Sequence, residues 1–157
     1  MSHKANLYIG KAGQLHVMSE FLMRGWNVAT PEVDTGDDIF VVEYDNDTFN
    51  RIQVKTAQAI ERKNGYSFQA NVPLYQLQEY DTAVYFIFAV RRHDSWADIL
   101  VISQGHLLDF FKDQNVGSVV GHSLMLYFSV QGKTVTCSSE DFSVYLNNFT
   151  DFPIVKH

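Results

Sequence analysis

The segment from Ala83 to Val90 places the strongest constraint on what this chain can fold into. It contains almost no polar residue, yet it is much shorter than a helix that crosses a membrane. A short apolar run of this kind is typical of a β-strand that is buried on both faces. Such a strand needs other elements packed above and below it. We therefore expect an α/β protein with a mixed central sheet flanked by helices.

A single domain spanning residues 1–157 is the simplest organisation for the chain. With 157 residues and 46% hydrophobic content, it is long enough to bury a full core. We find no repeat, low-complexity tract or linker that would divide it. Cys137 is the single cysteine, which excludes an intramolecular disulfide and the multi-cysteine zinc patterns. Without a signal peptide or an apolar span, the sequence predicts a soluble, cytoplasmic protein.

Hydrophobic periodicity predicts the first half of the fold. Apolar residues recur at helical spacing from Lys11 to Arg24, and Gly25 follows as a C-cap. The segments Ile39–Val42 and Arg51–Thr56 are rich in β-branched residues and flank the turn residues 45–47. They are therefore predicted to form a hairpin.

The second half is predicted to alternate short helices with further strands. The expected strands are Tyr66–Asn71, paired beside the hairpin, and Ala83–Val90, Ala97–Ile102, Leu124–Val130 and Thr134–Cys137. The expected helices are a short one from Val72 through Leu77, one capped by Ser103, and a final one over Asp141–Asn148.

Three polar residues of the predicted hairpin are candidates for a chemical site. Gln53 and Lys55 are two residues apart on a strand, so their side chains point to one face. Asp38 stands at the start of the preceding strand. If the two strands are neighbours, the three side chains converge at a sheet edge, where oxygen atoms lie beside an ammonium group.

The order of these elements resembles that of the PD-(D/E)xK nuclease superfamily, most closely its Holliday-junction-resolvase-like and restriction-endonuclease-like branches. The resemblance spans Ile9–Ala57 and is carried by residues 36–39, Gly-Asp-Asp-Ile, and residues 53–55, Gln-Val-Lys. It implies a restriction-endonuclease-like core. It also implies a metal-dependent endonuclease that hydrolyses phosphodiester bonds of DNA.

The resemblance assigns a role to each candidate residue. Asp38 would be the principal ligand of Mg²⁺ or Mn²⁺, assisted by the Gln53 amide and the Val54 carbonyl, while Lys55 would orient the attacking water. Related enzymes often carry a Glu on the first helix where Gln14 stands here. Gln14 heads the apolar stripe of that helix and should face the sheet. Because Asp38 is then the one carboxylate assigned to the site, beside neutral amide oxygens, we expect weak metal binding.

The formal charge of −6 gives no general support for nucleic-acid binding, which usually relies on a basic excess. Lys11, Arg62 and Lys63 are predicted to contact phosphates, with scattered surface charge as the alternative explanation. The six histidines follow no metal-ligand spacing and are interpreted as surface residues. DNA is the expected partner, and a homodimer is a further option. The alternative function is a catalytically decayed nuclease-fold module that binds nucleic acid or a protein.

Overall fold

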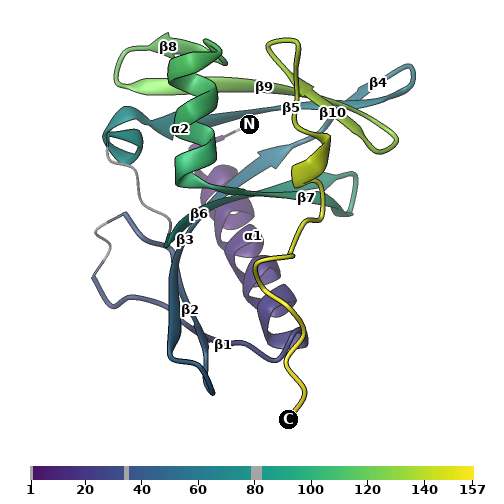
Figure 1. Ribbon diagram of the computed structural model, residues 1–157. Helices are drawn as coiled ribbons and strands as arrows, with labels where there is room; N and C mark the ends of the chain where they lie inside the picture. Colours follow the sequence, from purple (N-terminus) through teal and green to yellow (C-terminus); the bar gives the residue numbers. More distant parts are fainter. Residues whose placement is uncertain (1, 34–35, 79–82) are drawn as a thin grey trace.

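The computed structural model describes residues 2–33, 36–78 and 83–157. Within these residues the chain forms two β-sheets, two α-helices and short 3₁₀ helices, and Figure 1 shows their arrangement. No helix in this part of the chain is both long enough and apolar enough to cross a membrane. The candidate residues at 38, 53 and 55 all belong to the first sheet or its margin.

The first sheet has the strand order β1-β2-β3-β6-β7. Its strands are β1 (Asn27–Ala29), β2 (Ile39–Glu43), β3 (Thr48–Gln58), β6 (Val84–Arg92) and β7 (Ser95–Ser103). Neighbouring strands are antiparallel except β3 and β6, which are parallel. The sheet is therefore mixed, as predicted, and both the hairpin and the buried strand around residues 83–90 are confirmed.

Two helices cover opposite faces of this sheet, with α2 in front of it and α1 behind it in Figure 1. The strand β6 alternates between the two sides: Ile87 belongs to the hydrophobic cluster under α1 (His3–Met23), and Phe88 to the cluster under α2 (Gln104–Asp113). Ser103 accepts a hydrogen bond from the His106 N–H at 3.2 Å, which confirms the predicted N-cap of α2.

The first helix begins earlier than the sequence pattern indicated. Ser2 is its N-cap and accepts a hydrogen bond from the Ala5 N–H at 3.2 Å. The added turns contain exposed Leu7 and Tyr8, which break the amphipathic pattern and explain why the pattern missed them. At the other end the prediction is correct, because Gly25 follows the helix with φ of 81°.

The second sheet has the order β11-β10-β9-β5-β4, with β8 also paired to β9. Its strands are β4 (Ile60–Arg62), β5 (Gly65–Pro73), β8 (Ser118–Val120), β9 (Ser123–Gln131), β10 (Thr134–Cys137) and β11 (Glu140–Asp141). The predicted placement of residues 66–71 beside the hairpin is wrong, because β5 pairs with β4 and β9. Alternation along a strand shows which face is buried, but it does not identify the partner strand.

The C-terminal helix predicted over Asp141–Asn148 is also wrong. This stretch contains β11 and a 3₁₀ turn, Ser143–Tyr145, and then runs extended along β7. Asn147 holds it there: its side-chain oxygen accepts from the Ile99 N–H at 3.0 Å, and its own N–H donates to the Ile99 carbonyl at 2.7 Å. A φ of 51° at Asn147 is incompatible with a continuing helix. The predicted short helix near Leu77 is present as a 3₁₀ helix, Leu74–Leu77.

Candidate functional site

The candidate site lies where β3 extends beyond the end of its neighbour β2. The Asp38 N–H donates to the Ile52 carbonyl at 3.0 Å, one residue before β2 begins. The Asp38 carboxylate then accepts a hydrogen bond from the Val54 N–H at 2.7 Å. It thus takes the place of a further β2 residue and lies in the plane of the sheet. Because the N–H and C=O of an extended residue project to one side, the Val54 carbonyl faces the same edge.

The helix α1 reaches this edge because Gly13 allows it to approach β3 closely. A Cβ atom at Gly13 would overlap the Thr56 side chain. Gln14 then donates from Nε2 to the Asp38 carbonyl at 2.8 Å, and its Oε1 accepts from Lys11 Nζ at 3.0 Å. Gln14 therefore faces the sheet, as the helical stripe predicted.

Gln53 lies directly opposite Asp38 in the extended register, but its amide turns toward other partners. Its Nε2 donates to Asp37 Oδ1 at 3.0 Å, and its Oε1 accepts from Gln76 Nε2 at 3.2 Å. Arg51 lies 3.7 Å from the second Asp37 oxygen. Gln53 is buried, so these bonds fix its orientation. Lys55 follows on the same face of β3, half-buried and opposite Phe88 of β6.

Sequence reasoning missed Gln76, which extends this network to α2. The Gln76 carbonyl accepts from Gln104 Nε2 at 2.8 Å, while its side-chain oxygen is buried with no hydrogen-bond partner in the described structure. Gln76 stands 23 residues after Gln53 and Gln104 a further 28 residues on. No local spacing pattern joins residues so far apart, so the sequence held no signal for them.

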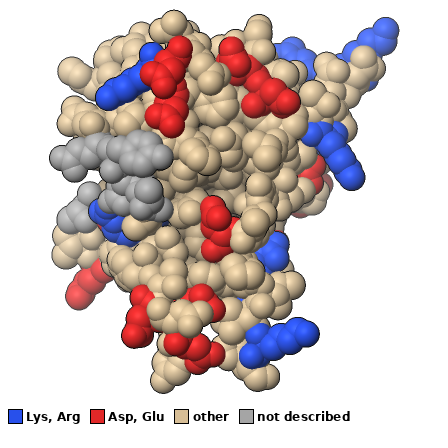
Figure 2. Space-filling view, in the orientation of Figure 1, with Lys and Arg blue, Asp and Glu red and all other residues tan. Residues whose placement is uncertain are grey.

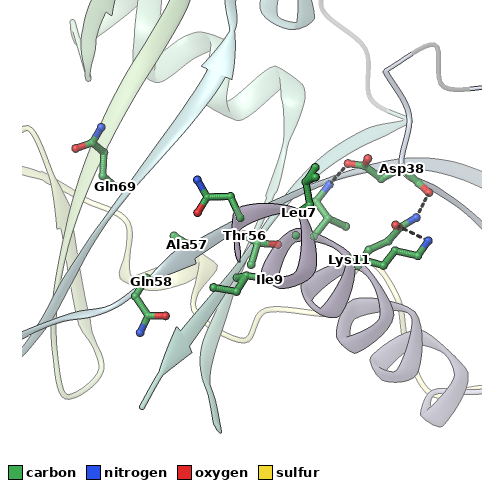
Figure 3. Close-up of a pocket in the computed structure, with 12 residues that line it drawn as sticks. Leu7, Ile9, Lys11, Asp38, Thr56, Ala57, Gln58 and Gln69 are labelled. Carbon is green, nitrogen blue, oxygen red and sulfur yellow. Dashed lines mark hydrogen bonds between the residues drawn. The ribbon is translucent and has the colours of Figure 1, made fainter. Parts of the chain in front are cut away.

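A cleft of about 610 Å³ opens beside the Asp38 carboxylate. It runs between the N-terminal half of α1 and the free edge of β3, and Figure 3 shows Asp38 at one end and Gln69 of β5 at the other. Gln14, Val54, Thr56 and Lys11 also line it. Lys55 and Gln53 are not among its lining residues, since they project from the other face of β3.

The oxygen atoms at this edge are suitable ligands for a hard cation such as Mg²⁺, but a single carboxylate predicts weak binding. Asp38 supplies a carboxylate and Val54 a carbonyl oxygen, and both are oxygen ligands of the kind Mg²⁺ prefers. Among residues 2–33, 36–78 and 83–157, no group of three or more His, Cys, Asp or Glu side chains is arranged to hold a metal ion. Among the described residues that line the cleft, Asp38 alone carries a carboxylate.

The predicted phosphate contacts are separated in space. Lys11 lines the cleft, whereas Arg62 ends β4 and Lys63 stands in the adjoining turn of the second sheet. Arg62 donates to Ser67 Oγ at 2.9 Å and also to the Tyr127 hydroxyl. On the face shown in Figure 2, lysine and arginine side chains are scattered and form no basic patch.

Five of the six histidines are exposed, as expected for surface residues, and His16 is partly buried. The His16 ring stacks on Trp96 with centroids 4.9 Å apart. This burial lowers the pKa of His16 below 6.5, an effect that the Glu20 carboxylate opposes. Glu20 also lies 3.8 Å from Arg24, and both side chains are partly buried.

Comparison with one solved structure supports the fold over nearly the whole chain. No protein-family model and no curated protein matches the sequence. Among solved structures, the bacterial homing endonuclease I-Ssp6803I is similar with a TM-score of 0.55 and 15% identity, over 95% of this chain and 90% of that chain. A weaker likeness is to Archaeoglobus fulgidus Hjc, a Holliday junction resolvase from an archaeal hyperthermophile, with a TM-score of 0.43, 12% identity and coverage of 78% and 84%. The chain has a nuclease-like α/β fold.

Proposed function

We propose that this protein is an endonuclease that hydrolyses phosphodiester bonds of DNA with the help of Mg²⁺ or Mn²⁺. The observation that carries the proposal is the meeting of the Asp38 carboxylate, the Val54 backbone and the Gln14 amide at the open edge of β3, beside a cleft. The likeness in fold to a homing endonuclease over nearly the whole chain supports it. A single unit, residues 1–157, would carry the activity, because β6 contributes to both hydrophobic clusters.

Each residue at this edge has a part that its chemistry permits. Asp38 and the Val54 carbonyl would hold the cation, with an amide oxygen from Gln14 or Gln53. A bound divalent cation would offset charge on the phosphate as the bond is cleaved. The resemblance to the PD-(D/E)xK nucleases gives Lys55 the role of orienting water and offsetting negative charge in the transition state, although its side chain leaves β3 on the face opposite the cleft. Lys11 in the cleft would contact a neighbouring phosphate.

The test is a cleavage assay on linear and branched DNA with Mn²⁺, comparing the wild type with Lys55→Ala and Asp38→Asn. The Asn side chain can still accept a hydrogen bond from the Val54 N–H, so it removes the charge and keeps the contact. Lys112→Ala on α2 is the matched control for loss of a lysine. We expect cleavage by the wild type and the control, and loss of at least 10²-fold in the other two variants. An inactive wild type, or full activity in Lys55→Ala, would contradict the proposal.

A second candidate is a catalytically decayed module that binds nucleic acid or a protein partner. The hydrogen bonds of two amide groups favour this function. The side-chain oxygens of Gln14 and Gln53 already accept hydrogen bonds from Lys11 and Gln76, which reduces their capacity to bind a cation. Titration calorimetry with Mg²⁺ and Mn²⁺ separates the two functions. Binding heat that disappears in Asp38→Asn supports the enzyme, whereas no heat in the wild type supports the decayed module.

A further inference from the structure

The outer face of the second sheet is unusual for a chain with 18 acidic residues. Its two central strands, β5 and β9, turn their apolar side chains into the core that they share with β6. The residues that alternate with these form the outer face of the two strands and carry hydroxyl, amide or thioether groups without charge. We call this surface the polar sheet face; it consists of Ser67, Gln69, Asn71, Met125, Tyr127 and Ser129.

Hydrogen bonds hold part of the polar sheet face in a fixed arrangement. Arg62 of the neighbouring strand donates to Ser67 Oγ and to the Tyr127 hydroxyl, and those two oxygens lie 2.9 Å apart. Gln69 stands opposite Tyr127 in the strand register, and Asn71 stands opposite Met125. Both amide side chains are exposed. Ser67 itself is buried, so the groups that reach solvent on this face are the Gln69 and Asn71 amides and the Tyr127 hydroxyl.

The polar sheet face is continuous with the candidate site. Gln69 belongs to both, because it lines the cleft that also holds Lys11 and Asp38. Figure 3 shows Gln69 and Asp38 at opposite ends of this hollow. A ligand that lay along β5 and β9 would extend into the cleft without leaving the protein surface.

We propose that the polar sheet face reads base edges in the major groove of duplex DNA. This rests on the proposed function, since it names how that site would select its substrate. The major groove admits a two-stranded β-ribbon, and Asn and Gln amides pair with both N6 and N7 of adenine. Arg62 Nε and Nη2 already donate to Ser67 Oγ and the Tyr127 hydroxyl, so base contacts on this face fall to the Gln69 and Asn71 amides.

This mode of recognition also accommodates the charge of the chain. Uncharged side chains do not repel phosphates, so an overall charge of −6 does not prevent close approach of this face to DNA. Amide contacts to bases contribute sequence preference and release few counterions. Binding should therefore be selective for sequence while its salt dependence stays shallow.

The experiment is selection from a library of randomised duplexes, using the Asp38→Asn protein in EDTA so that cleavage plays no part. The selected sequence is then titrated with the same protein carrying Gln69→Ala and Asn71→Ala together. Gln114→Ala, at the end of α2, is the matched control. Both substituted amides are exposed, so the fold should persist, and a melting curve for each variant checks this.

We expect the double variant to bind the selected sequence more weakly by about 5- to 150-fold per lost amide contact, with relaxed preference at the matching base pairs. The slope of log Kd against log salt should stay unchanged, and Gln114→Ala should bind like its parent. Selection of no sequence by the parent, or an unchanged sequence and affinity in the double variant, would overturn the proposal. Sequence selection by a wild type that cuts nothing would refute the enzyme and leave this recognition face intact.

Discussion

Replacing Gln14 with Glu tests whether this edge is a cation site. Glu cannot donate a hydrogen bond, so the variant loses the 2.8 Å contact to the Asp38 carbonyl. Leaving a partly buried acceptor without its donor costs about 1–3 kcal/mol. Lys11, now bonded to the Gln14 oxygen at 3.0 Å, would form an ion pair with the new carboxylate and recover about 0.2–0.5 kcal/mol.

The expected net loss in EDTA is about 0.5–2.8 kcal/mol in the free energy of unfolding. For a chain of this size, that lowers Tm by about 1–11 °C. A divalent cation should reverse the loss, because the variant places a second carboxylate beside Asp38. Cation at 100 times its Kd adds about 2.7 kcal/mol to stability, enough to offset the substitution.

Thermal unfolding in EDTA and in Mg²⁺ or Mn²⁺ measures both effects. Gln14→Ala is the control, since it loses the same hydrogen bond without gaining a carboxylate. We expect Gln14→Glu to recover its Tm with cation, the wild type to gain less, and Gln14→Ala to show no recovery. Equal melting temperatures for Gln14→Glu with and without cation would refute the assignment of this edge as a cation site.

Three further predictions concern stability and pH. Gly13→Val should cost about 1–3 kcal/mol in urea unfolding because its side chain overlaps Thr56, and Thr56→Ala in the same chain should restore part of the loss. Because burial lowers the pKa of His16, its contribution is full above pH 6.5 and is lost as pH falls from 6.5 to the folded pKa; His16→Asn should flatten that part of the stability profile. Burial raises the pKa of Tyr85 to about 12, so stability should fall as pH rises from 10 toward 12, and less steeply in Tyr85→Phe.

Elements whose local signals agreed with their tertiary setting could be predicted from the sequence. The strand around Phe86 is apolar on both sides because a hydrophobic cluster lies against each of its faces. The Ser103 cap depends on atoms three residues apart. The helix predicted over Asp141–Asn148 is wrong for the opposite reason. Asn147 exchanges hydrogen bonds with Ile99, 48 residues away, and these contacts override a weak helical pattern.

The same distinction holds within the candidate site. Spacing placed Gln53 and Lys55 on one face of β3, and helical periodicity turned Gln14 toward the sheet, which its bond to the Asp38 carbonyl confirms. Spacing could not show that the Gln53 amide is held by Asp37 and Gln76 rather than turned to the cleft. That orientation depends on a hydrogen bond from Gln76, which lies in the 3₁₀ helix Leu74–Leu77, far along the chain from Gln53.

Two hydrogen bonds to the backbone of β3 hold Asp38 at this edge. Its N–H continues the ladder to Ile52, and its carboxylate takes the next ladder position at Val54. Substitutions at Gln14 would therefore change the charge of the edge while leaving Asp38 in place. A fold of this kind can gain or lose a cation by exchanging one amide for a carboxylate. On the proposed function, activity and fold would be separable here, and the presence or absence of a carboxylate at position 14 would distinguish an enzyme from a binding module.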